Sequence, residues 1–153
     1  MATEIIIPTT KLHLQTGKEI YLQADNGMYL SRINRGDTDP IEAAKRSIDV
    51  HCAFKVTILD DLTIALQADT GKYLSRINRG DTDPIEAAKS VIDSHCRFKV
   101  MQLCSAQDQT YLALQADSGM WLSRINRGDK DPIEAAKSGI DSYCLFVVRH
   151  LER

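Results

Sequence analysis

The chain has 153 residues, of which 43% are hydrophobic and 26% are charged, values that are ordinary for a globular protein. Its formal net charge is −2, so we expect no overall attraction to nucleic acid or to an anionic membrane. No stretch approaches the roughly 18 consecutive apolar residues that a membrane-spanning helix needs. The first residues, MATEIIIPTT, do not form a signal peptide, so we expect a cytoplasmic protein, or one secreted without a signal peptide.

One segment occurs three times along the chain. Leu30–Lys45 reads LSRINRGDTDPIEAAK, Leu74–Lys89 repeats these letters, and Leu122–Lys137 differs from them only at Lys130. Because open solenoids usually need more copies, three copies predict a structure that closes about a threefold axis. We therefore expect one domain over residues 1–153, with repeats at about 12–56, 57–100 and 101–148.

Each repeat is predicted to contain four short strands. In the second copy, the strand that ends in LQAD leads into a tight turn at Asp69–Gly71, where glycine can adopt a positive φ. KYLSRI is the second strand, and the loop NRGDTDP follows it. IEAAK contains good helix formers, but five residues between a proline and a turn are too few for a stable helix, so we predict a third strand.

The end of each repeat is predicted to return to the core. SVIDSHC is expected to form a turn or one helical turn, and CRFKVMQL is expected to be the fourth strand, with Cys96, Phe98 and Val100 pointing inward. The N-terminal residues 4–17 should supply the strand that closes the ring against the C-terminal FVVRHL. Twelve such strands predict an all-β fold, the β-trefoil, with three pseudo-symmetric four-stranded repeats, a six-stranded barrel and a cap of three hairpins.

The cysteines fit this repeat better than they fit a disulfide framework. Cys52, Cys96 and Cys144 occupy one equivalent position, whereas Cys104 is an extra residue. Three equivalent thiols cannot pair evenly, and each shares an alternating pattern with inward Phe and Val residues. We therefore predict reduced cysteines that act as small buried hydrophobic residues.

The polar residues of the repeated loop need a further explanation, because packing alone does not keep solvated side chains unchanged. In one interpretation, Arg32 or Arg35 clamps Asp37 or Asp39 across the hairpin, while Asn34 and Asp37 satisfy loop amides. In the other, the loops are three equivalent ligand sites. Both interpretations stay open on the sequence, and they are compatible because a binding loop must be rigid.

Several chemistries are disfavoured by the residue pattern. The RGD tripeptide of each loop would need an extracellular, exposed setting to act in adhesion. Asp37, Asp39 and Glu42 lack the further carboxylates of a calcium loop and have two arginines beside them. His51 and Cys52 are neighbours on a predicted strand, so they should point to opposite faces and form no dyad. We expect no enzyme activity, no metal and no cofactor.

Two further patterns have both a binding and a structural interpretation. Asp49 stands two residues before His51, and a carboxylate with a ring nitrogen suits the hydroxyl pairs of a sugar. The same Asp can instead cap the local turn. One position is always aromatic, as Tyr29, Tyr73 or Trp121, and it can either stack on a sugar ring or pack under the hairpin cap.

The motifs GKYLSRI and CRFKV resemble the repeat of fascin-like trefoils, which include the actin-binding fascins and hisactophilins. The same frame is similar to mussel-type galactose-binding trefoil lectins, in which an Asp-x-His and a glycine-containing loop build three sites. Ser31 and Arg32 replace the His-Pro of those lectins, and Tyr143 replaces the third His. A lone trefoil also lacks the several domains with which fascin bundles filaments.

The sequence thus predicts a non-enzymatic lectin with three pseudo-equivalent sites that bind glycans or glycoproteins. The alternative is a fascin-like actin-binding module or another protein-interaction module, and a trefoil inhibitor or toxin-associated domain comes third. The candidate ligand-binding residues are the polar and glycine positions of the three copies: Arg32, Asn34, Arg35, Gly36, Asp37, Asp39, Asp49, His51, Arg76, Asn78, Arg79, Gly80, Asp81, Asp83, Asp93, His95, Arg124, Asn126, Arg127, Gly128, Asp129, Asp131, Asp141 and Tyr143.

Overall fold

A computed structural model describes residues 5–7, 14–104 and 110–149 of the chain. Its strands are β1 Ile5–Ile7, β2 Glu19–Gln23, β3 Tyr29–Arg32, β4 Ile41–Lys45, β5 Phe54–Asp60, β6 Thr63–Gln67, β7 Tyr73–Arg76, β8 Ile85–Lys89, β9 Phe98–Cys104, β10 Thr110–Gln115, β11 Trp121–Arg124, β12 Ile133–Lys137 and β13 Phe146–Arg149. Single 3₁₀ turns lie at Val50–Cys52, Ser94–Cys96 and Ser142–Cys144. Among these residues, no helix has the length and apolar character that crossing a membrane requires.

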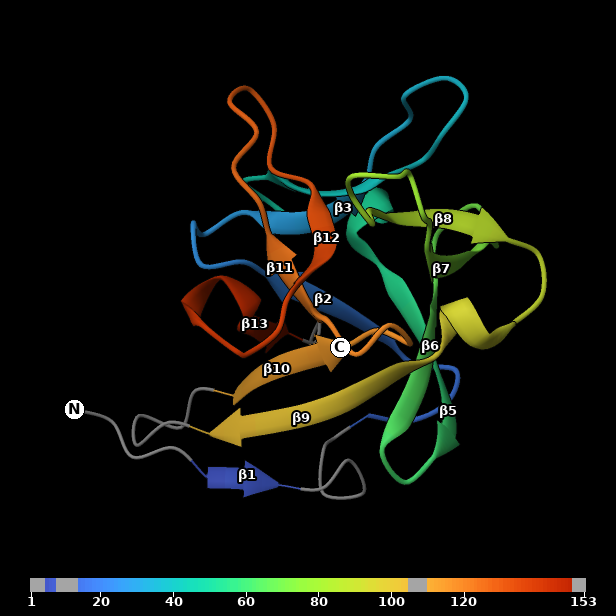
Figure 1. Ribbon diagram of the computed structural model, residues 1–153. Coiled ribbons are helices and arrows are strands. Elements are labelled where there is room, and N and C mark those ends of the chain that lie inside the picture. The colour runs from blue at the N-terminus through green and yellow to red at the C-terminus, as the bar shows by residue number, and fades with distance from the viewer. Residues whose placement is uncertain (1–4, 8–13, 105–109, 150–153) are drawn as a thin grey trace.

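Six strands close into a barrel, as the repeat predicts. The antiparallel ring runs β2–β5–β6–β9–β10–β13 and returns to β2, and Figure 1 shows these strands in the lower part of the molecule. Alternate residues of these strands point inward and fill the barrel with equivalent side chains from the three repeats. The largest fully buried ones include Phe54, Phe98, Phe146, Ile20, Ile64, Leu112, Leu22, Leu66 and Leu114.

The prediction for the closing strand was wrong in its position. The strand that pairs with β13 is β2, which begins just after the predicted segment, whereas β1 lies within that segment and pairs with β9. The reason is the length of β9. It meets β6 only at Phe98 and Lys99, so the edge of its last residues is left for β1 to pair with.

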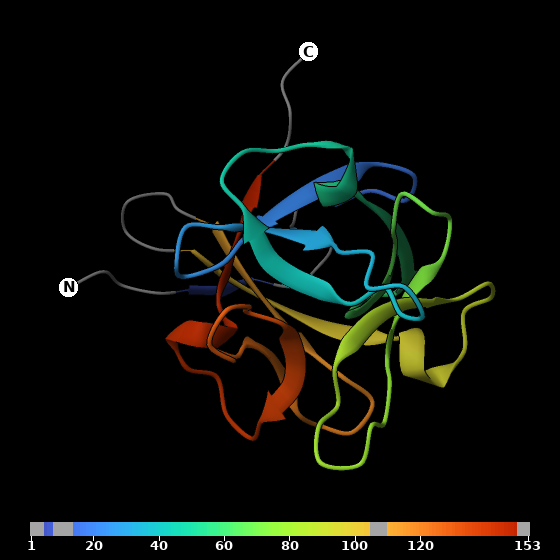
Figure 2. The same ribbon diagram turned by 90° about the horizontal axis from the view of Figure 1, so that it is seen from above.

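Of the other strands, all except β1 form three hairpins, β3–β4, β7–β8 and β11–β12, which cap the barrel. IEAAK is a strand in every copy, as predicted. The third strands meet one another around the threefold axis through the bridges Pro40–Glu86, Pro84–Glu134 and Glu42–Pro132, so the cap is a closed triangle, seen from above in Figure 2. This pairing explains why helix-favouring residues adopt an extended backbone.

The cysteine and turn predictions are also confirmed. Cys52, Cys96 and Cys144 are fully buried and free, and burial raises the pKa of their thiols. They lie in the 3₁₀ turns rather than on the following strands. A one-turn helix therefore connects each hairpin of the cap to the next strand of the barrel.

The repeated loop is a tight and ordered turn in each copy. Gly36 has a φ of 87°, a conformation in which a Cβ is strained. Asn34 Oδ1 accepts a hydrogen bond from the Gly36 amide at 2.9 Å, as predicted, and the Arg35 amide donates to Thr38 at 2.9 Å. The three loops project from the same end of the molecule, the upper end in Figure 1.

Candidate functional site

The arginine at the end of each second strand joins two repeats. The side chain of Arg32 is only 10% exposed, and it contacts Asp39 of its own loop at 3.2 Å. It also forms a bidentate pair with Asp69, in the first hairpin turn of the next repeat, at 2.7 and 3.0 Å. Such planar two-point pairs are strong and directional. They hold the pKa of Asp69 at about 2, against the opposing effect of burial.

The same contact recurs around the ring and closes it. Arg76 binds Asp117 at 2.8 Å, and Arg124 binds Asp25 of the first repeat at 2.7 Å. We call the contact between each of these arginines and the turn aspartate of the following repeat a clasp. The three clasps define junction I between repeats 1 and 2, junction II between repeats 2 and 3, and junction III between repeats 3 and 1.

The residue two positions after Asp49, Asp93 or Asp141 also lies at the clasp, and it is a histidine in junctions I and II and Tyr143 in junction III. His51 Nδ1 lies 2.8 Å from Asp69 Oδ2 in junction I, and His95 lies 2.8 Å from Asp117 in junction II. The same Nδ1 atoms lie 3.1 and 3.2 Å from Nη2 of Arg32 and Arg76, so each ring nitrogen stands between a carboxylate and a guanidinium group. In junction III, Tyr143 instead packs its ring 5.2 Å from the Arg124 guanidinium carbon.

The second arginine of the loop binds a buried glutamate. The prediction that Arg32 or Arg35 clamps Asp37 or Asp39 is met by the contact between Arg32 and Asp39. Arg35 instead forms a bidentate pair with Glu42, at 2.9 and 2.6 Å. Glu42 is buried because β4 packs on both faces, and its carboxylate needs a cation more than an exposed aspartate does. Arg79–Glu86 and Arg127–Glu134 repeat the pair. The arginine of each RGD tripeptide is thus anchored to the hairpin.

The loop tips carry the remaining candidates. Asp37, Asp81 and Asp129 are exposed, and so are the asparagine and glycine residues beside them. Asp39, Asp83 and Asp131 are half-buried and bound to their own loop's clasp arginine. The structure therefore separates the loop candidates into exposed residues at the loop tips and ion-paired aspartates at the base of each loop.

The Asp-x-His candidates do not form one ligand pair. Asp49 caps the 3₁₀ turn, since its Oδ1 accepts from the His51 amide at 3.0 Å, and its other oxygen binds Lys45. Asp93 and Asp141 bind Lys89 and Lys137 in the same way. The hydrogen bond from Lys89 lowers the pKa of Asp93 to about 2. The histidine side chains turn instead toward the clasps.

Sequence reasoning included the contact of Arg32 with Asp39, but it missed Asp69 as the partner of Arg32 in the next repeat, Glu42 as the partner of Arg35 and Lys45 as the partner of Asp49. The turn aspartates Asp25, Asp69 and Asp117 occur in an LQAD motif present in all three copies, and this constancy was the available signal. The constancy of the buried glutamates was a second signal. A charged residue that stays constant between two inward strand residues indicates a buried pair. The pairing across repeats was not visible in the sequence.

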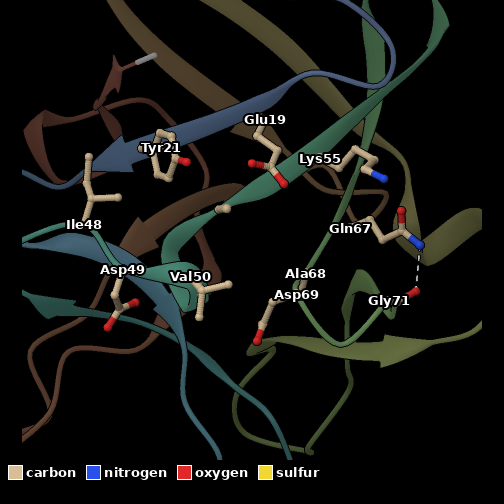
Figure 3. Close-up of a pocket in the computed structure, with 11 residues that line it drawn as sticks. Glu19, Tyr21, Ile48, Asp49, Val50, Lys55, Gln67, Ala68, Asp69 and Gly71 are labelled. Atoms are coloured by element: carbon tan, nitrogen blue, oxygen red, sulfur yellow. Dashed lines mark hydrogen bonds between the residues drawn. The ribbon is translucent and has the colours of Figure 1, made fainter. Parts of the chain in front are cut away.

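A hollow of about 480 Å³ opens beside the clasp of junction I (Figure 3). Glu19 and Tyr21 come from β2, Lys55 from β5 and Gln67 from β6, while the turn with Asp69 closes the far side. Val50, which is 65% exposed, adds an apolar edge. The clasp thus fixes one wall of a hollow that carries both polar and apolar groups.

A second hollow, of about 380 Å³, lies at the equivalent place in junction II. Its lining includes Lys99, Gln115 and Asp117, which are the repeat equivalents of Lys55, Gln67 and Asp69. Gln67 and Gln115 each donate Nε2 to the carbonyl of the turn glycine at 2.8 Å. Within the described ranges, no donor reaches either Gln Oε1 and no carboxylate lies within ion-pair distance of either lysine ammonium.

Comparison with known proteins supports the fold and leaves the ligand open. No protein family and no curated protein matches the chain. A designed threefold-symmetric protein, ThreeFoil, is similar in structure with a TM-score of 0.70 and 17% identity, over 87% of this chain and 99% of that one. A Polyporus squamosus lectin, bound to the human-type influenza-binding epitope Neu5Aca2-6Galb1-4GlcNAc, is similar with a TM-score of 0.71 and 10% identity. That match covers 90% of this chain and 50% of the lectin chain. The fold is a β-trefoil.

Proposed function

We propose that the protein is a non-enzymatic glycan-binding protein whose sites are the hollows at the junctions between repeats. The observation that supports this most is the recurrence of one hollow, with the same Lys, Gln and Asp, at junctions I and II. A sugar presents hydroxyls that donate and accept at fixed spacing, and few convergent polar groups on a rigid wall suit such a ligand.

The chemistry of the hollow fits a saccharide in three ways. The ammonium of Lys55 donates to hydroxyl oxygens, and Gln67 Oε1 is an acceptor that faces no competing protein donor among the described residues. Asp69 keeps acceptor capacity beyond the bonds from Arg32 and the contact with His51, because a carboxylate has about four lone-pair sites. Val50, which is 65% exposed, supplies apolar surface for a ring face.

The fold adds an indirect argument. A β-trefoil lectin is among the structures that share this architecture, although its identity to the chain is low. Two weak sites on one rigid body also gain avidity for clustered glycans, because the second contact forms at a high effective concentration. The repeated hollow therefore has a functional value that a single site would lack.

The test is a glycan array followed by a titration of the best ligand. Removing the two ammonium groups together, in Lys55→Ala with Lys99→Ala, should weaken binding about tenfold or more, since a hydrogen bond to a charged group contributes about 1.5–3 kcal/mol. Thermal unfolding should change little, because both lysines are exposed. The matched control is Lys130→Thr, which gives the third loop the residue of the other two copies.

A second variant distinguishes the junctions from the loop tips. The triple change Asp37→Ala, Asp81→Ala and Asp129→Ala removes the exposed loop carboxylates and leaves the clasps intact. We expect binding to persist in this protein. If binding is lost there and kept in the lysine double variant, the loops are the site. If the array is blank and the protein co-sediments with filamentous actin, the proposal of glycan binding is overturned.

A further inference from the structure

The three junctions share one frame but differ in what lines them. The clasp distances are 2.7 Å in junction I, 2.8 Å in junction II and 2.7 Å in junction III. The hairpins and 3₁₀ turns are also equivalent. Any difference in binding between junctions therefore has to come from side chains that are not part of the repeated segment.

We propose that the chain carries two glycan sites and not three, and that a lysine on the barrel strand decides which junctions bind. This proposal rests on the function proposed above and deepens it. Lys55 on β5 and Lys99 on β9 line the hollows of junctions I and II. The equivalent residue on β13 is Val147, so junction III has no cation at this position.

A second substitution in junction III makes its surface more apolar. The position of Ala53 and Arg97 is occupied by Leu145 in the third repeat, and Leu145 and Val147 are both half-buried. Two branched aliphatic side chains therefore stand where junction II has two cationic ones. A surface of this kind offers packing but no donors for sugar hydroxyls.

The acceptor of junction III is also occupied. Gln23 is the equivalent of Gln67 and makes the same bond to its turn glycine, at 2.8 Å. Its Oε1, however, accepts from Arg149 Nε and Nη2 at 3.2 and 3.1 Å. The first repeat has Thr57 at the position of Arg149, so junction I contains no equivalent donor.

The remaining difference points in the same direction. Tyr143 replaces the histidine of the other clasps and lies between two cations, with Lys137 Nζ 4.8 Å from its ring. Junction III is the place where β13 meets β2, so it closes the barrel. Its lining is specialised for holding the first and last repeats together, whereas junctions I and II keep their donors and acceptors open.

The decisive measurement is the number of glycans bound per chain, counted by equilibrium dialysis with the best monovalent oligosaccharide of the array. We expect two per chain for the natural protein and one for Lys55→Ala. A graft of the first repeat's residues into junction III, Val147→Lys with Arg149→Thr, should raise the number to three. The single change Arg149→Thr is the control and should leave it at two.

The outcomes separate this inference from the function on which it rests. Three glycans bound to the natural protein would overturn the two-site proposal and leave glycan binding intact. A count of two that Lys55→Ala does not lower would show that this lysine does not define a site. Absence of any glycan binding would overturn both. If the graft does not fold, the Lys55→Ala count still decides, because Lys55 is exposed.

Discussion

The change Arg76→Ala is expected to lower the free energy of unfolding by about 3 kcal/mol. Arg76 is only 13% exposed and holds Asp117 of the next repeat and Asp83 of its own loop. Removing one member of a largely buried ion pair leaves the other charges without a partner, which typically costs about 3–5 kcal/mol. Partial exposure of both aspartates places the expected value at the lower end.

Chemical denaturation at neutral pH measures this loss. Lys130→Thr is again a suitable control, because it changes an exposed loop residue to one that two copies already contain. If Arg76→Ala destabilises the protein no more than the control does, the clasps do not hold the repeats together.

Acidification is expected to destabilise the protein through the clasp carboxylates. Hydrogen bonds from Arg32 hold the pKa of Asp69 at about 2, compared with 3.8 for the free side chain. A lowered pKa gives stability that is complete above pH 4 and is lost as the pH falls through 2. For Asp69 alone, this corresponds to about 2 kcal/mol. Arg76 lowers the pKa of Asp117 in the same direction.

The variant Asp69→Asn isolates this contribution. It should be less stable than the natural protein at pH 7 and should lose less stability between pH 5 and pH 2, because the group that titrates is gone. Unfolding free energies measured across this range test the prediction. Equal slopes for the two proteins would show that Asp69 does not carry the acid sensitivity.

Much of the fold could be predicted from the sequence, because the three copies could be compared with one another. Three copies and their constant apolar positions indicated a closed threefold barrel. The five-residue length of IEAAK correctly outweighed its helix propensity, since pairing in the cap decides the conformation. The pairing of β1 with β9 could not be predicted from the sequence, because it depends on how far β9 extends past β6.

The contacts around the candidate site could be predicted only in part from the sequence. Constancy drew attention to Arg32 and Arg35, and sequence neighbours suggested partners within the same loop, of which the contact between Arg32 and Asp39 is present. The actual main partners are Asp69, which lies in the next repeat, and Glu42, which is buried in the cap. Ion pairs of this kind depend on three-dimensional packing across repeats, and a single chain gives no spacing rule for them.

These contacts change how the constant polar residues are interpreted. Ion pairs that join the repeats and anchor each loop explain why the arginines and the aspartates at the base of the loops stay unchanged. The hollows at the junctions are lined partly by residues that vary between copies, such as Lys55 and its equivalent Val147. We therefore attribute the difference between the two binding junctions and the closing junction to the residues that vary between copies.

The most direct test of this account is a map of backbone amide shifts by nuclear magnetic resonance during titration with the best glycan of the array. We predict that the shifts gather at the junction glycines Gly71 and Gly119 and at the lysines that line the two hollows. Shifts confined to the loop glycines Gly36, Gly80 and Gly128 would contradict the account, because they would place the ligand on the loop tips.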